Sequence, residues 1–114
     1  MRKRKAVCQL EDLDDPGSRG FSIQSGNETL EGFVVQRDAQ VFAYRNRCPH
    51  TGSPLDWVEH QFLDLDKAFI QCAVHDALFE IDSGFCVAGP CPGESLQSLE
   101  VEVVEQTVYL VFGD

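Results

Sequence analysis

The sequence lacks any long apolar segment and shows no clear export signal. No apolar run in its 114 residues approaches the roughly 20 residues that a membrane-spanning helix needs, which argues against an integral membrane protein. The basic start, residues 1–5, is followed by a mixed polar segment instead of an apolar one, so we expect no secretory signal. We therefore expect a cytoplasmic protein.

Positive charge is also scarce. The chain has 9 lysines and arginines against 19 acidic residues, for a net charge of −10, and only 5 of the bases lie beyond residue 5. An acidic body of this kind is repelled by phosphate groups, which argues against nucleic acid and anionic membranes as partners. The acidic surface either steers a basic protein partner or serves solubility alone. We interpret the basic residues 1–5 as a solvated tail.

Helical periodicity is weak throughout, and short apolar runs separated by turn residues dominate instead. The runs typical of strands lie at residues 33–36, 41–44, 68–71, 78–81, 99–103 and 107–112. The first two predict a hairpin, and the last two predict a second, half-buried hairpin in which valines alternate with glutamates. Residues 84–98, rich in glycine and proline, predict a long ordered loop, and residues 56–62 predict at most one helical turn. The pattern favours an all-β sandwich or small barrel.

The cysteine count is odd, which argues against a disulfide framework in a chain without an export signal. In a reducing compartment, clustered cysteines more often indicate a metal site, catalysis or small buried hydrophobes. The five are Cys8, Cys48, Cys72, Cys86 and Cys91.

Two short segments pair a cysteine with a histidine: Cys48-Pro49-His50, and Cys72 with His75 three residues later. Each follows a predicted strand, so each can be a loop at a strand end. Zinc fingers tend to take a cysteine pair from one segment and a histidine pair from another. A two-iron cluster whose irons have different ligands instead needs both residue types from each side. A structural zinc site and unrelated thiols and histidines remain the alternatives.

The segments 48–55, 72–75 and 84–90 resemble those of Rieske-type [2Fe-2S] proteins, and most of all the small soluble Rieske ferredoxins. The resemblance extends over roughly residues 32–112. It implies one [2Fe-2S] cluster per chain, with Cys48 and Cys72 on one iron and His50 and His75 on the other. It also implies a single domain, 1–114, that is an antiparallel β-sandwich or barrel with a cluster-binding subdomain at about 46–92. The loop at Gly89 then resembles the third loop, which shields the cluster from water.

Some positions differ from those of the high-potential members of this family. Those members carry a further cysteine in each ligand loop, where this sequence has Ser53 and Val74. They also carry a serine and a tyrosine that donate hydrogen bonds to cluster sulfurs, where this sequence has Ala77 and Phe79. Because donors to sulfur stabilise the reduced state, we expect a potential near the low end of the roughly −150 to +300 mV range of Rieske centres. Asp76 replaces a glycine that is common in the family.

The resemblance implies an electron carrier that takes single electrons from a flavin-dependent reductase and passes them to a terminal oxygenase or another redox enzyme. We expect no enzymatic activity of its own, because the sequence shows no nucleophile–base pair and is too short to add a mononuclear-iron catalytic domain. The alternatives are a Rieske-like accessory subunit of a nitrite reductase and a zinc-stapled, non-redox binding module. Four cysteines and histidines have no assigned ligand role. Cys8 is expected in a strand and His60 is expected to face solvent. Cys86 and Cys91 are expected to pack, and the alternatives for them are a disulfide or a second metal site.

Overall fold

The structure is a computed structural model that describes residues 2–47, 49, 55, 60–72, 77–89 and 93–113. These residues form nine β-strands and one short 3-10 helix, η1 (Leu10–Asp12). The predicted all-β class is therefore confirmed. Among the described residues no helix is long and apolar enough to cross a membrane. Most of the helical turn predicted at residues 56–62 lies outside the described residues.

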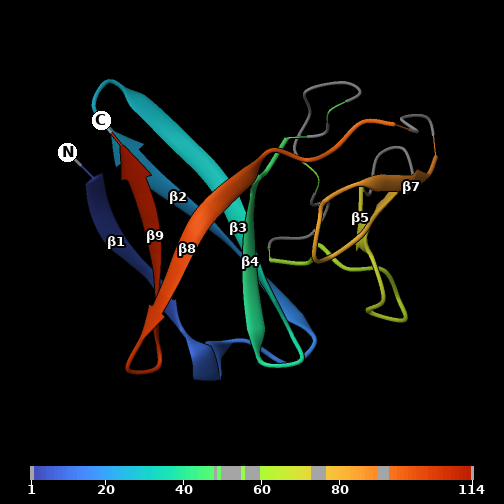
Figure 1. Cartoon of the computed structure of the whole chain (residues 1–114), viewed down its shortest axis with the longest axis horizontal. Coiled ribbons are helices and arrows are strands. Elements are labelled where there is room, and N and C mark those ends of the chain that lie inside the picture. The colour runs from blue at the N-terminus through green and yellow to red at the C-terminus, as the bar shows by residue number, and fades with distance from the viewer. Residues whose placement is uncertain are drawn as a thin grey trace.

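The larger sheet has six strands in the order β1-β9-β8-β4-β3-β2, and Figure 1 shows them curled into an open barrel. All of its strand pairs are antiparallel. β8 links the two halves of this sheet, because its first two residues pair with β4 and the rest pair with β9. The strands are β1 (Arg2–Gln9), β2 (Gly17–Ser25), β3 (Glu28–Arg37), β4 (Gln40–Arg45), β8 (Ser98–Val104) and β9 (Thr107–Gly113).

The smaller sheet lies beside the barrel, at the right of Figure 1, in the order β5-β6-β7. Its strands are β5 (Ile70–Gln71), β6 (Leu78–Phe79) and β7 (Cys86–Ala88). The first two confirm the strands predicted at 68–71 and 78–81, although both are shorter. The prediction that 84–98 is all loop was wrong, because β7 pairs with β6 inside it. A strand of three residues is too short to show a period of two in the sequence.

The β3–β4 hairpin separates two hydrophobic cores. Phe33, Val35 and Tyr44 face the core that the smaller sheet covers. Val34 and Ala43 face the opposite way, into the core of the barrel. Successive side chains of a strand point to opposite faces, so a continuous apolar run is what a strand buried on both faces requires. The hairpin is thus the shared wall of the barrel and the smaller sheet.

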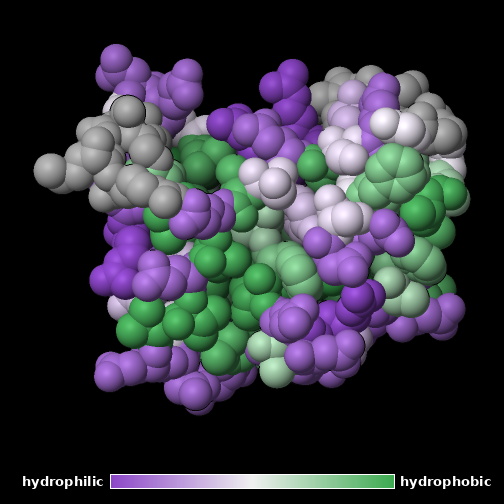
Figure 2. Space-filling view, in the orientation of Figure 1, coloured by the Kyte–Doolittle hydropathy of each residue, from purple (hydrophilic) through white to green (hydrophobic). Residues whose placement is uncertain are grey.

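The surface is mainly hydrophilic around its margins in the view of Figure 2, with apolar side chains over the middle of the barrel and near β7. Two exposed apolar residues belong to the β7 region: Phe85 and Val87 have exposed fractions of 42% and 45%. They flank Cys86, which is buried. β7 therefore alternates between an apolar outer face and a core-facing thiol.

Both predicted hairpins are confirmed, and both turn through two residues with positive φ. Asp38 and Ala39 have φ of 54° and 64°, and Glu105 and Gln106 have φ of 49° and 72°. Two successive left-handed residues match the twist of the flanking strands, although glycine and asparagine are the residues that tolerate this conformation best. Alanine at the second position is therefore strained.

We expect Ala39→Gly to stabilise the protein by about 0.5 to 1 kcal/mol, because glycine removes the cost of the left-handed conformation. Chemical denaturation of both proteins measures the difference. Ala39→Val is the matched opposite change, and it is expected to destabilise because a β-branched side chain tolerates positive φ poorly. A destabilised Ala39→Gly protein would contradict this account of the turn.

The interpretation of the basic N-terminal residues as a solvated tail was wrong. They lie in β1, which pairs with β9. Arg4 Nη1 lies 3.3 Å from Glu102 Oε1, and the Arg4 guanidinium lies 4.9 Å from the centroid of the Tyr109 ring. Four successive basic residues show no alternation of apolar and polar side chains, so the sequence gives no sign of a strand here. Edge strands such as β1 nevertheless commonly carry charges, which oppose aggregation.

Candidate metal centre

Cys72 is the one predicted ligand that the described residues include. It follows directly after β5 and is fully buried, with an exposed fraction of 0%. Its backbone N–H donates a hydrogen bond to the carbonyl of Ala77 at 2.9 Å, which extends the β5–β6 pairing by one residue pair. Cys72 and Ala77 therefore lie opposite each other at one end of this strand pair, as the strand-end prediction requires.

The first ligand segment begins and ends at fixed points. The Asn46 side-chain Oδ1 accepts a hydrogen bond from the Leu55 N–H at 2.7 Å. The Asn46 N–H donates to the Glu31 carbonyl at 3.0 Å, next to the end of β4. Leu55 is fully buried in the same core as Cys72. The two ends of segment 46–55 are thus joined to each other, to β3 and to the core that contains Cys72.

The other predicted ligands, Cys48, His50 and His75, lie outside the described residues, and so does Cys91. Within the described ranges, no three His, Cys, Asp or Glu side chains are grouped as a metal site. The complete ligand set and the subdomain boundary at 46–92 therefore stay predictions.

Gly89, in the predicted third loop, packs directly on Ala77, which lies just after the second ligand segment. A Cβ placed on Gly89 would lie 2.6 Å from Ala77 Cα, and Gly89 has φ of +102°. Both facts demand glycine, because other residues rarely adopt this conformation and the neighbouring atom belongs to the backbone. Nearby Cys86 is buried, as expected for a packing residue, and its thiol donates to the Ala88 carbonyl at 3.3 Å.

The surroundings of Cys72 fit a thiolate ligand to iron. Ala77 and Phe79, at the positions where high-potential relatives carry hydroxyls, are both fully buried in the same core as Cys72. Neither side chain offers a hydrogen-bond donor. A soft sulfur ligand in an apolar setting suits iron–sulfur clusters.

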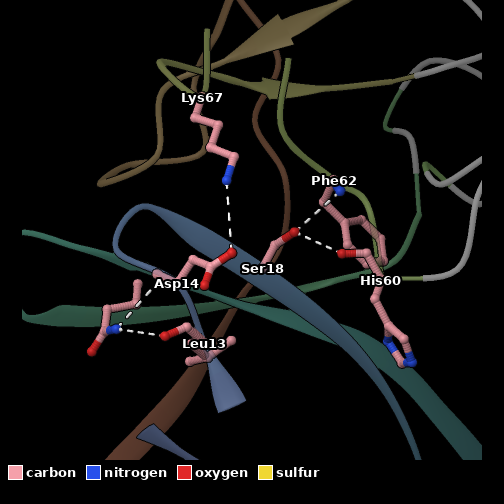
Figure 3. Close-up of polar contacts among 7 residues, drawn as sticks. Leu13, Asp14, Ser18, His60, Phe62 and Lys67 are labelled. Atoms are coloured by element: carbon pink, nitrogen blue, oxygen red, sulfur yellow. Dashed lines mark hydrogen bonds and ion pairs between the residues drawn. The ribbon is translucent and has the colours of Figure 1, made fainter. Parts of the chain in front are cut away.

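His60 is not the solvent-facing residue that we expected. Its ring Nδ1 accepts a hydrogen bond from the Gly20 N–H at 3.0 Å. Figure 3 shows the Ser18 hydroxyl facing both His60 and Phe62: it donates to the His60 carbonyl at 2.8 Å and accepts from the Phe62 N–H at 3.2 Å. Phe62 stacks on Phe33, with ring centroids 4.2 Å apart. These contacts fix the segment between the two ligand segments to the barrel.

Sequence reasoning missed this connection because its partners lie on β2, some forty positions away. A lone histidine in a polar segment carries no local signal of such a bond.

Tyr44 joins the barrel to the smaller sheet. Its hydroxyl donates a hydrogen bond to the Ile81 carbonyl at 2.7 Å. Burial of the side chain, assisted by the nearby Asp82 carboxylate, raises the pKa of Tyr44 to about 12. The native state therefore holds this proton more tightly than the unfolded chain, whose tyrosines have a pKa of about 10.

We expect the stabilisation from this proton to be complete below about pH 10 and to be lost as the pH rises through 12, by about 2 kcal/mol in total. Denaturation midpoints measured from pH 9 to pH 12 test this, as the difference between the wild type and Tyr44→Phe. The substituted protein has no phenol to ionise, so the difference between the two proteins should shrink over that window. A constant difference would contradict the assignment.

Comparison with known proteins gives a family and a fold. The model of the Rieske [2Fe-2S] domain family matches residues 3–110. A chain in the complex of reduced oxygenase and oxidized ferredoxin in carbazole 1,9a-dioxygenase is 23% identical, with a TM-score of 0.72 over 94% of this chain and 91% of that chain. The ferredoxin of carbazole 1,9a-dioxygenase from Nocardioides aromaticivorans IC177 is 21% identical, with a TM-score of 0.71 over 95% and 96% of the two chains.

A larger protein contains the same fold. The terminal oxygenase of carbazole 1,9a-dioxygenase from Novosphingobium sp. KA1 is 20% identical, with a TM-score of 0.77 over 97% of this chain and 30% of that chain. The search of curated proteins finds no match. At these identities the structural similarity shows the fold, and it confirms the antiparallel β architecture that the resemblance implied.

Proposed function

This chain belongs to the Rieske [2Fe-2S] domain family, and from this premise we propose that it carries single electrons between two redox proteins. Its cofactor is a [2Fe-2S] cluster, which when bound supplies a one-electron redox couple. We propose that Cys48 and Cys72 hold one iron and that His50 and His75 hold the other. In this proposal 1–114 is a single domain, in which 46–92 forms the cluster-binding part.

Two segments meet at one end of the smaller sheet, and the first ligand segment is anchored in the same core; this is the observation that supports the ligand set best. The hydrogen bond between Cys72 and Ala77 closes the second ligand segment, and the bond between Asn46 and Leu55 closes the first. Gly89 lies against Ala77. Leu55, Cys72 and Ala77 are fully buried in one core, which is the arrangement that a cluster bound by both ligand segments requires.

For the partners, we propose a flavin-dependent reductase as donor and a terminal oxygenase as acceptor. The support for the oxygenase is the similarity to a chain from a complex of oxygenase and ferredoxin. We further propose that the protein is a carrier without catalysis of its own. This chain covers nearly the whole of the Nocardioides ferredoxin but a minor part of the oxygenase chain, 96% against 30%.

The buried surroundings of Cys72 support a low potential. Ala77 and Phe79 are fully buried and lack hydroxyls, so these two side chains donate no hydrogen bond to the cofactor. Fewer donors to the cluster sulfurs and a net charge of −10 both disfavour the extra negative charge of the reduced state.

The test is to purify the protein without oxygen and measure its iron, sulfide and zinc contents, its visible spectrum and its potentiometric titration. We expect a red-brown protein with iron and sulfide in equal amounts, titrating as a one-electron couple below zero millivolts. A colourless protein with one zinc per chain would overturn the proposed function. A potential well above zero would contradict only the low potential inferred from Ala77 and Phe79, and it would leave the proposed electron carrier intact.

A further inference from the structure

A hollow of about 230 Å³ opens beside the first ligand segment. Two segments meet in it, because the Arg45 N–H donates a hydrogen bond to the Gln97 carbonyl at 2.9 Å. Pro49 lies in its wall and stands between the predicted ligands Cys48 and His50. The described residues that line it are Arg45, Arg47, Pro49, Ser95 and Gln97.

This hollow is positively charged in an otherwise acidic protein. Among the described residues that line it, two are arginines and none is acidic. Arg47 is exposed, and among the described residues neither arginine has an ion-pair partner. Arg4, Arg37 and Lys67 differ in this respect, since each lies within 4 Å of a carboxylate oxygen.

Arg45 also carries an unsatisfied donor. Its Nε is buried and has no hydrogen-bond partner within the described part of the chain. A buried N–H without an acceptor costs about 1 to 3 kcal/mol, and more when the group is charged. Arg45 also lines a second hollow, whose walls include Glu28 and Glu100, but neither carboxylate forms an ion pair with it among the described residues. An acceptor from outside would supply the missing partner, and a carboxylate is the acceptor whose geometry matches the planar guanidinium.

We propose that this hollow receives a carboxylate from an acidic segment of the redox partner. The proposal rests on the proposed function, because it places that contact next to the ligand segment. The acidic body attracts a partner that is basic overall, whereas the arginine pair accepts a local acidic segment. Because the acidic body and the arginine pair lie at separate places on the surface, they set the orientation in which the partner binds, as well as the rate of association.

Stopped-flow oxidation of the reduced protein tests this with two small oxidants of opposite charge, ferricyanide and tris(phenanthroline)cobalt(III). Ferricyanide stands in for the partner's negative charge, and the ratio of the two rate constants cancels any change in the protein's potential. We expect Arg47→Gln to lower the ferricyanide-to-cobalt ratio by about threefold or more at low salt, and high salt to remove the difference. Hexaglutamate should slow the ferricyanide reaction of the wild type and leave that of Arg47→Gln unchanged.

Lys67→Gln is the matched control. It makes the same change in net charge, but Lys67 precedes β5, whereas Cys72 follows it. Equal ratios in the Arg47→Gln and Lys67→Gln proteins would overturn the proposal while leaving the electron carrier intact. The proposal would also be overturned if hexaglutamate slowed the ferricyanide reactions of Arg47→Gln and Lys67→Gln equally. A protein without a visible chromophore would give no reaction to time in any variant, and would overturn the proposed function together with this inference.

Discussion

Cys72→Ser is expected to abolish cluster assembly, with complete loss of visible absorption and of bound iron. Cys72 is fully buried at the end of β5, and a serine hydroxyl there is a harder and far less acidic ligand than a thiol. Iron and sulfide analysis of the protein purified without oxygen measures the loss. Circular dichroism in the far ultraviolet shows whether the strands persist.

Cys86→Ser is the matched control for this change. Cys86 is buried in the same core, with an exposed fraction of 1%, and it is not a predicted ligand. Its replacement should leave the spectrum and the iron content unchanged, at a modest cost in stability. If Cys72→Ser kept its full iron content, or if both substitutions removed the iron equally, Cys72 would not be a specific ligand.

Gly89→Ala is expected to have the largest effect on stability, a loss of about 2 to 4 kcal/mol. The new Cβ would lie 2.6 Å from Ala77 Cα, and the residue would have to hold φ of +102°. Relief of the clash displaces the backbone next to the second ligand segment, so cluster retention should fall as well. The denaturation midpoint of the holoprotein and its iron content measure both effects.

Gly93→Ala separates strain from contact. Gly93 also has positive φ, +86°, but a Cβ there meets no atom of the described residues within 4 Å. Gly93→Ala should therefore lower the free energy of unfolding only by the cost of the left-handed backbone conformation, about 1 to 2 kcal/mol. It should leave the iron content unchanged. Similar losses for the two substitutions would show that the contact between Gly89 and Ala77 does not matter.

The sequence was sufficient where local pattern determines structure. Both hairpins were predicted because apolar runs flank short polar connections, although the first was given a four-residue connection, 37–40, where the turn has two residues. Cys72 was placed at a strand end because an apolar run precedes it. Gly89 lies against Ala77, and the third loop that the family resemblance implied around it stays a prediction.

The features that were not predicted depend on distant partners. β1 consists largely of basic residues and is a strand because β9 provides its hydrogen bonds. β2 contains two glycines and four serines or glutamines, and it is held by its full pairing with β3. His60 is fixed by Gly20 of β2. In each case the deciding contact joins residues far apart in the chain, which tertiary packing settles and local propensity does not.

The position of β3 between two cores has a consequence for how the protein unfolds. Phe33 and Val34 belong to different cores, so β3 contributes side chains to both. Unfolding of either sheet therefore exposes apolar side chains of β3 and weakens the packing of the other sheet. Removal of the cofactor from the smaller sheet should therefore speed amide hydrogen exchange inside the barrel as well. We therefore expect the molecule to unfold as one cooperative unit, in which loss of the metal from the smaller sheet is detected as faster amide exchange in the barrel.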